Sequence, residues 1–178
     1  MEAKEDLRVV KTRKVIKQTF LEMRAEMPLE KIHIRELCKR ALINKSTFYN
    51  HYEDVYALSE EMENDAIAQF LERFPARDCL FSDPVRFVSE MPEAFDANME
   101  LLHPLFNGRL DEAFNKLEQQ LKRQYTTPGM TTQETVQLTF LLNGTLHTLK
   151  ELNFGQDCDH RAFEAAVASL IQRSVFPQ

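Results

Sequence analysis

Segment 43–52, written INKSTFYNHY, gathers hydrogen-bonding side chains in a chain that is acidic overall. It supplies asparagine, lysine, serine, threonine, tyrosine and histidine, and it contains neither Asp nor Glu. Lysine and hydroxyl groups suit phosphate oxygens, and asparagine can form two hydrogen bonds with the edge of an adenine. The chemistry that this segment favours is therefore the binding of a polyanion.

The distribution of charge supports this interpretation, although the total charge does not. The 178 residues carry a net charge of −6. Residues 1–52 hold 12 Lys/Arg and 7 Asp/Glu, a net of +5, whereas residues 53–178 hold 10 and 21, a net of −11. A basic N-terminal part on an acidic remainder confines the attraction for phosphate to one end of the chain.

The elements that must position this segment are expected to be helices. Only four glycines occur and no alternating β-branched run is present, while apolar residues recur at steps of three and four. Prolines and capping residues mark the helix ends. The fold class is therefore predicted to be all-α with about nine helices: 9–27, 34–41, 45–52, 54–74, 83–98 with a kink or break near Pro92, 99–106, 109–125, 132–153 and 158–175.

Two of these helices, 34–41 and 45–52, are short and are joined by a tight turn, which is the helix-turn-helix arrangement. Phe48 and Tyr52 lie four residues apart, so both are expected to point inward. The other polar side chains then face outward, where a helix can enter the major groove of DNA. These outward residues are Lys45, Ser46, Thr47, Tyr49, Asn50 and His51.

Several spaced blocks in the first third of the chain resemble one known family. Thr12-Arg13 with Ile16, then IRELC at 34–38 with Ala41, then STFYNHY at 46–52 are similar to the DNA-binding head of tetracycline-repressor-type (TetR/AcrR) transcriptional regulators. The resemblance implies a helix-turn-helix head over residues 1–53 and a helical ligand-binding and dimerisation body over residues 54–178. It also implies a homodimer on a palindromic operator in double-stranded DNA, repressing or less often activating genes, and an unknown small-molecule effector that releases it.

The matched motif also implies roles for single residues. Thr47, Tyr49 and His51 are expected to contact phosphates, and Lys45, Ser46 and Asn50 to face bases. His33 and Arg35 complete the expected set of DNA-binding residues.

The chain departs from the family pattern at three places. Leu42 stands in the turn where the family usually has glycine, so a non-glycine residue must accept the turn conformation, or the turn has another shape. His33 stands where a capping threonine is usual. Glu53-Asp54 replaces a lysine that often reaches phosphate, so we expect weaker and more salt-sensitive DNA binding, unless basic residues of the first helix compensate: Arg8, Lys11, Arg13 and Lys14.

The helices after residue 54 are expected to form a ligand pocket and a dimer interface. Aromatic residues with a few polar ones suit a small-molecule pocket; the candidates are Phe95, Leu102, His103, Phe106, Phe114, Phe140, Asn143 and His147. Helix 132–153 is apolar on two faces, which requires a second cover besides its own body. We therefore expect it to form a four-helix dimer interface with helix 158–175, and Leu149→Glu to weaken the dimer.

Other functions find less support in the residues. Asp157-Cys158-Asp159-His160 resembles a metal corner, but no second ligand cluster accompanies it, and an aspartate there also serves as a helix cap. No motif of a phosphate-binding loop, a nucleophile elbow or a zinc protease occurs, so neither an enzyme nor a cofactor is expected. Two alternatives stay open: a helical module that binds DNA or protein without a small-molecule ligand, and an all-helical enzyme.

The compartment is expected to be the cytoplasm. Cys38, Cys79 and Cys158 are odd in number and show no paired spacing, which favours free thiols in a reducing environment. No apolar run reaches the length of a membrane span, and no signal peptide is expected at the N-terminus.

Overall fold

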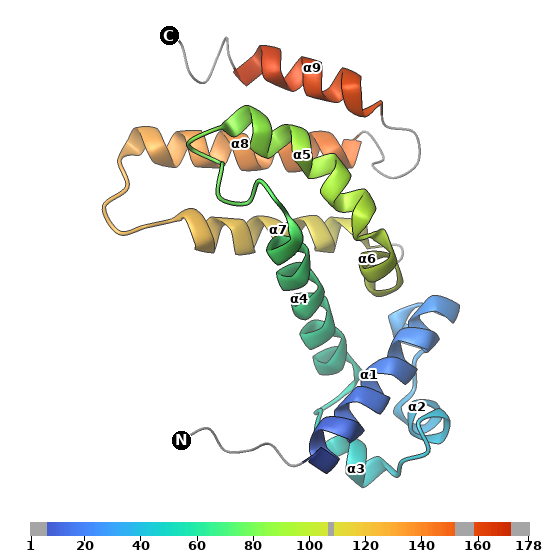
Figure 1. Cartoon of the computed structure of the whole chain (residues 1–178). Coiled ribbons are helices and arrows are strands. Elements are labelled where there is room, and N and C mark those ends of the chain that lie inside the picture. The colour runs from blue at the N-terminus through green and yellow to red at the C-terminus, as the bar shows by residue number, and fades with distance from the viewer. Residues whose placement is uncertain (1–6, 107–108, 152–158, 172–178) are drawn as a thin grey trace. The chain divides into compact units, whose positions relative to one another are not determined.

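The computed structural model describes residues 7–106, 109–151 and 159–171. These residues form nine α-helices and one short 3-10 helix, and none of them belongs to a strand (Figure 1). The prediction of an all-α fold with about nine helices is confirmed.

The described residues form two compact units. Unit 1 contains residues 7–65 and 103–106, and unit 2 contains residues 66–102, 109–151 and 159–171. The division falls inside two helices, α4 (Val55–Arg73) and α6 (Met99–Phe106). The sequence places the boundary after residue 53, whereas unit 1 extends along α4 to Asp65, because acidic residues of α4 bind the first helix.

Unit 1 begins with α1 (Leu7–Glu26), a 3-10 helix (Leu29–Lys31), α2 (Ile34–Arg40) and α3 (Lys45–Tyr49). Pro28 follows the end of α1, since proline disfavours helical geometry in the residue before it. Asp54 caps α4, its carboxylate accepting a hydrogen bond from the Ala57 backbone N–H at 2.8 Å. These ends agree with the ends expected from the sequence.

The core of unit 1 is built by the apolar stripe of α1. Ile16, Phe20 and Met23 are fully buried, as are Leu37 of α2 and Phe48 of α3. A buried charge accompanies them, because Arg24 of α1 has no exposed surface. Its Nη2 donates to the Leu105 carbonyl of α6 at 2.6 Å, and Nη1 donates to the Met27 carbonyl at 3.4 Å.

Unit 2 contains α5 (Pro84–Ala97), α7 (Leu110–Tyr125), α8 (Thr132–Glu151) and α9 (His160–Leu170). The N-cap of α5 is Asp83, which accepts from the Arg86 N–H at 3.1 Å. The helix continues through Pro92, so of the kink or break expected there, the break is absent. Helix α8 packs against α7 and α5, and α5 also packs against α9.

The two apolar faces of α8 have different surroundings within unit 2. Leu138, Leu142 and Leu149 are buried, whereas Val136 and Phe140 are 60% and 64% exposed. Leu149 is therefore a core residue, and Leu149→Glu would disrupt unit 2 itself. A test of the dimer must use the outward face instead.

Candidate nucleic-acid interface

The turn between α2 and α3 holds a leucine in a conformation that favours glycine. Leu42 has a φ of +53°, in the left-handed region, and its side chain is 93% exposed. The turn is closed by backbone bonds, with the Ala41 N–H donating to Leu37 at 2.8 Å and the Ile43 N–H to Cys38 at 3.0 Å. Of the two alternatives that Leu42 raises, the structure contains the first: leucine accepts the turn conformation.

Asn44 fixes the start of α3 as its N-cap. Its Oδ1 accepts from the Thr47 backbone N–H at 2.8 Å and from the hydroxyls of Ser46 and Thr47 at 2.7 and 2.8 Å. Both hydroxyl hydrogens are therefore directed at the cap in this structure. Either hydroxyl must rotate away from Asn44 before it can donate to a phosphate oxygen.

Two aromatic residues hold α3 on the rest of unit 1. Phe48 is fully buried and Tyr52 is 5% exposed, with their ring centroids 5.8 Å apart. Helix α3 ends at Tyr49, three residues earlier than expected, and a hydrogen-bonded turn continues to Tyr52, whose N–H donates to Phe48. The inward direction of both rings is as the four-residue spacing predicts.

Residues 45–52, here called the interface segment, carry on their outward side the polar set expected from the sequence. Lys45, Ser46, Tyr49 and Asn50 are exposed, while Thr47 and His51 are half-buried. The six residues thus come together around one short helix and its closing turn. His33 and Arg35, at the start of α2, are also exposed. His33 occupies the N-cap position of α2, but its side chain forms no capping hydrogen bond.

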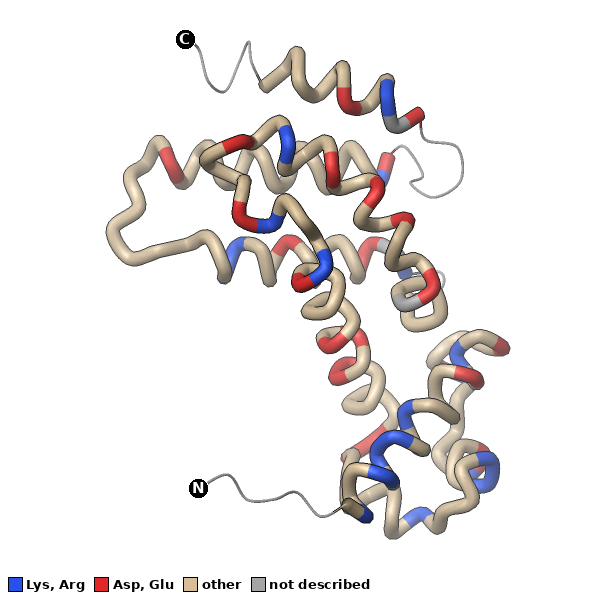
Figure 2. The backbone as a smooth tube through the Cα atoms, in the orientation of Figure 1, with Lys and Arg blue, Asp and Glu red and all other residues tan. Residues whose placement is uncertain are grey.

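Unit 1 carries several exposed cations, and Figure 2 shows Lys and Arg positions along its helices. Lys11, Lys14, Lys39 and Lys45 are exposed and form no ion pair with the residues that the structure describes. Glu53, which follows the interface segment in the sequence, is also exposed. The exposed lysines of unit 1 would therefore attract phosphate, and the carboxylate of Glu53 would reduce that attraction.

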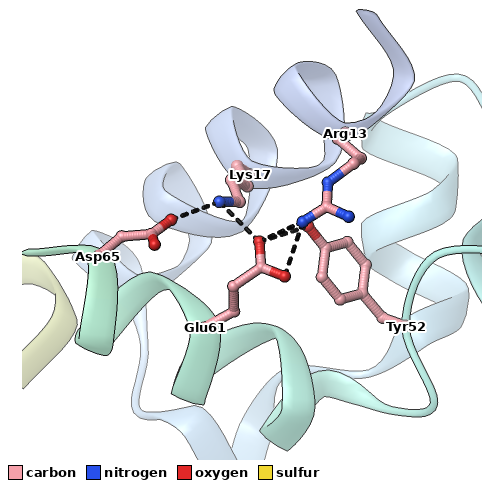
Figure 3. Close-up of polar contacts among 5 residues, drawn as sticks. All are labelled: Arg13, Lys17, Tyr52, Glu61 and Asp65. Atoms are coloured by element: carbon pink, nitrogen blue, oxygen red, sulfur yellow. Dashed lines mark hydrogen bonds and ion pairs between the residues drawn. The ribbon is translucent and has the colours of Figure 1, made fainter. Parts of the chain in front are cut away.

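Two further cations of α1 are neutralised inside the unit (Figure 3). Arg13 Nη2 donates to both carboxylate oxygens of Glu61 at 2.7 Å. Lys17 Nζ lies 2.7 Å from Glu61 Oε1 and 2.7 Å from Asp65 Oδ2. Arg13, one of the residues expected to compensate for Glu53-Asp54, is thus bound to α4. We name Arg13, Lys17, Tyr52, Glu61 and Asp65 the Glu61 cluster.

The protonation states in this cluster follow from its contacts. Burial raises the pKa of Glu61, but hydrogen bonds from Lys17 and Arg13 outweigh it, and the net pKa lies below the ordinary value. Burial, and then the charge of Glu61, raise the pKa of Tyr52. Glu61 therefore stays ionised and Tyr52 keeps its hydroxyl hydrogen, which it donates to Glu61 Oε1 at 3.2 Å.

Sequence reasoning missed the Glu61 cluster, although a signal was present. Arg13 and Lys17 are four residues apart on α1, and Glu61 and Asp65 are four residues apart on α4. Residues four apart share one face of a helix, so two helices that pack side by side can match such pairs. The spacing indicates the match only once the two helices are known to be neighbours.

The candidates for a ligand pocket are placed in different surroundings. Phe95 and Phe114 are buried and pack ring to ring at 5.1 Å, next to Phe70. Leu102 and Phe106 are also buried, whereas His103 is exposed. Three others, Phe140, Asn143 and His147, line an open groove on the outward face of α8, together with Val136 and Gly144.

This groove on α8 has a volume of about 560 Å³. Asn143 Oδ1 is buried there and has no hydrogen-bond partner among the described residues. A Cβ added at Gly144 would meet no atom within 4 Å. The groove is therefore open, mostly apolar, and supplies one unsatisfied acceptor.

The remaining expectations concern metals and membranes. Of the possible metal corner at 157–160, residues 157 and 158 lie outside the described residues, and Asp159 caps α9 by accepting from the N–H groups of Arg161 and Ala162. No cluster of three metal-ligating side chains occurs in the part of the chain that the structure describes. Within that part, every helix is too short or too polar to cross a lipid bilayer.

Comparison of the chain with family models, curated proteins and solved structures gives no match. The assignment of the interface segment therefore depends on its geometry and on the motifs of the sequence.

Proposed function

We propose that this protein is a DNA-binding transcriptional regulator of the tetracycline-repressor type, which binds a palindromic operator as a homodimer. One observation carries the proposal. Phe48 and Tyr52 fix α3 from the inside, so that Lys45, Tyr49 and Asn50 project outward from a short helix behind a tight turn. This arrangement is the one by which a helix-turn-helix protein reads the major groove.

The outward side chains divide into two chemical classes. Tyr49 is 54% exposed as a residue, and its hydroxyl suits a phosphate oxygen. A phosphate contact positions the protein but carries no base information. Asn50 is exposed and can form two hydrogen bonds with an adenine edge. Lys45 suits either a phosphate or the O6 and N7 atoms of guanine.

Electrostatics supports binding that is weak and strongly dependent on salt. Lys11, Lys14, Lys39 and Lys45 are exposed cations of unit 1, but Arg13 and Lys17 already bind acids of α4. Each phosphate neutralised by a cation contributes about 0.9 to the slope of log K against log salt. The slope is therefore expected to reflect the exposed cations of unit 1, Arg35 included, and not Arg13 or Lys17.

The homodimer is supported by the outward face of α8. Val136 and Phe140 are large, apolar and exposed, and Asn143 Oδ1 beside them lacks a partner among the described residues. A second copy of the chain placed on this face would cover the apolar side chains and could donate to Asn143. Two-fold symmetry would repeat each contact.

The proposed regulator could exist in two forms, one that responds to a small-molecule effector and one that does not. A ligand-responsive repressor requires a site in unit 2 whose occupation changes DNA affinity. The ring contacts of Phe70, Phe95 and Phe114, with centroids 4.8 and 5.1 Å apart, favour a core role for these three residues. The second form is a regulator that takes no small molecule. A thermal-shift screen followed by DNA competition separates them: a compound that stabilises the protein and releases DNA establishes the first.

The proposal is tested by selecting bound sequences from a random pool of duplex DNA. A recovered palindrome with half-sites about one helical turn apart, or a multiple of it, supports head, dimer and function together. Asn50→Ala should then relax the preference at one position in each half-site, while Tyr49→Phe should weaken all sequences about equally. If the pool yields no enriched sequence, or if both substitutions leave binding unchanged at moderate salt, the proposal is refuted.

A further inference from the structure

We infer that Glu61 is a positioning residue for DNA recognition: it orients the interface segment through Tyr52 and does not itself contact DNA. The inference rests on the proposed function and deepens it, because it assigns control of DNA affinity to a carboxylate that lies behind the interface segment.

Three donors from two different elements meet at one carboxylate oxygen. Glu61 Oε1 accepts from Arg13 Nη2 at 2.7 Å and from Lys17 Nζ at 2.7 Å, both on α1. It also accepts from the Tyr52 hydroxyl at 3.2 Å. Figure 3 shows these groups converging on Glu61 from α1 and from the end of the interface segment. Glu61 therefore joins α1, α4 and the interface segment at a single point.

Tyr52 carries this fixation to the interface segment. It is the last residue of that segment, it is 5% exposed, and its ring packs against Phe48 of α3. The guanidinium of Arg13 lies 5.5 Å from the centroid of the same ring, within the range of a cation–π interaction. The ring is thus held on one side by Phe48, on another by Arg13, and at its hydroxyl by Glu61. Its rotation or displacement would move the turn that carries Asn50 and His51.

The burial of these groups makes Glu61 more important than an ordinary surface carboxylate. The side chain of Glu61 is 32% exposed, and those of Arg13 and Lys17 are 36% and 28% exposed. A fully exposed ion pair contributes little, because solvent screens it. Tyr52, in contrast, is only 5% exposed as a residue, and its bond to Glu61 is part-buried, so a donor there that loses its acceptor is more costly than one in solvent. Loss of Glu61 should therefore displace Tyr52 rather than leave it unchanged.

The same contacts permit an opposite role, and the two roles predict opposite results. Glu61 could act as a mask that keeps Arg13 and Lys17 away from phosphate. Removing a mask would free cations, tighten DNA binding and steepen its salt dependence. Removing a positioning residue would weaken binding to the operator and leave the salt dependence almost unchanged. The link to the buried Tyr52 favours positioning.

The experiment compares four variants of the full-length chain with the wild type by fluorescence anisotropy: Glu61→Gln, Tyr52→Phe, the double variant and Glu60→Gln. Glu60 is the neighbouring exposed carboxylate on α4, so Glu60→Gln makes the same change in charge without disturbing the cluster. Each protein is titrated with the operator recovered from the random pool and with a scrambled duplex, at several salt concentrations. Stoichiometric titration gives the fraction of each protein that is able to bind DNA. Thermal melting gives the temperatures at which each variant is folded.

Relative to Glu60→Gln, we expect Glu61→Gln to lower operator affinity by about tenfold or more, the equivalent of one base contact. The amide keeps one carbonyl acceptor, but it loses the negative charge that binds Arg13 and Lys17, so it accepts from Tyr52 more weakly than the carboxylate does. Affinity for the scrambled duplex and the salt slope should be unchanged, a selectivity that simple loss of stability would not produce. Tyr52→Phe keeps the ring and both ion pairs, so it should show the same selective loss and carries the test if Glu61→Gln does not fold. The double variant should be no weaker than the weaker single variant.

Several outcomes would overturn the inference. Tighter binding by Glu61→Gln with a steeper salt slope would identify Glu61 as a mask. Equal behaviour of Glu61→Gln and Glu60→Gln, or additive effects in the double variant, would show that Glu61 does not act through Tyr52. Failure of the wild type to bind any selected sequence refutes the proposed function, and the inference with it. Operator binding that tolerates Glu61→Gln refutes the inference alone.

Discussion

Replacing Phe140 by aspartate should separate the two copies of the proposed dimer without unfolding either one. Phe140 lies on the outward face of α8 and is 64% exposed within its own chain. The substitution removes little packing from the protomer, because the buried face of α8 is formed by other residues such as Leu138 and Leu142. Its effect should therefore fall on association.

The size of the effect follows from the exposed area. A phenylalanine side chain presents about 150–250 Å², so 64% exposure leaves roughly 100–160 Å² available to a partner. At about 25 cal/mol per Å², burying this area is worth about 2.5–4 kcal/mol per copy. A symmetric dimer contains the residue twice, and association costs consume part of the gain. We expect Phe140→Asp to raise the dissociation constant of the dimer by at least about 100-fold, or about 2.7 kcal/mol.

The assay is sedimentation velocity over a range of concentrations, combined with thermal melting. The wild type should sediment as a dimer at micromolar concentration and Phe140→Asp as a monomer with a nearly unchanged melting transition. Leu149→Glu is the matched interior control, since Leu149 is fully buried, and it should lose the folded state instead. A wild type that sediments as a monomer, or a Phe140→Asp dimer of undiminished affinity, would refute the reasoning.

Three further predictions concern unit 1. Leu42→Gly removes a left-handed strain of roughly 1–2 kcal/mol, and the extra freedom of glycine in the unfolded chain offsets about 0.5–1 kcal/mol of this gain. The melting temperature should therefore rise by about 1–4 °C, and a lower melting temperature would contradict the +53° φ as a source of strain. Arg24→Met leaves the carbonyls of Leu105 and Met27 without their cationic donor and should lower the free energy of unfolding, measured in urea, by about 1–3 kcal/mol. An unchanged midpoint of the urea transition would show that other groups replace these hydrogen bonds. Because the pKa of Glu61 is depressed, the stabilisation by Glu61 is present above the ordinary pKa of 4.5 and is lost as pH falls through the lower folded pKa. The stability difference between wild type and Glu61→Gln should therefore shrink below about pH 4.5. A difference independent of pH would exclude the ion pairs as its cause.

Local chemistry made much of unit 1 predictable. Pro28, Asn44 and Asp54 limit helices through forces that act within one turn, and all three act as the sequence indicates. The four-residue spacing of Phe48 and Tyr52 similarly predicts which side of the interface segment is buried. These inferences need only a helical period, which a single sequence contains.

Features that depend on distant neighbours could not be predicted in the same way. The Glu61 cluster joins residues 48 positions apart, so its existence depends on how α1 and α4 pack. Helix α8 has two apolar faces, and the period alone does not tell which one faces the core. For this reason the prediction that places Leu149 at the dimer interface is wrong. Phe95 and Phe140 share a residue type, yet one is packed and the other exposed, because composition does not distinguish a core from a groove.

The pair Asn143-Gly144 lies inside α8, and its deamidation would report how often this helix unfolds locally. In a flexible chain, asparagine before glycine deamidates readily. The following backbone nitrogen attacks the side-chain carbonyl and expels the amide nitrogen as ammonia, which closes a succinimide ring, and water then opens this ring to aspartate or isoaspartate. A helix holds that nitrogen in a hydrogen bond to the fourth preceding carbonyl and away from the attack geometry. Isoaspartate at Asn143 should therefore accumulate in stored protein only as fast as α8 transiently unfolds. Each such event would place a negative charge in the groove beside Phe140, so ageing of the sample would weaken self-association before it altered the interface segment.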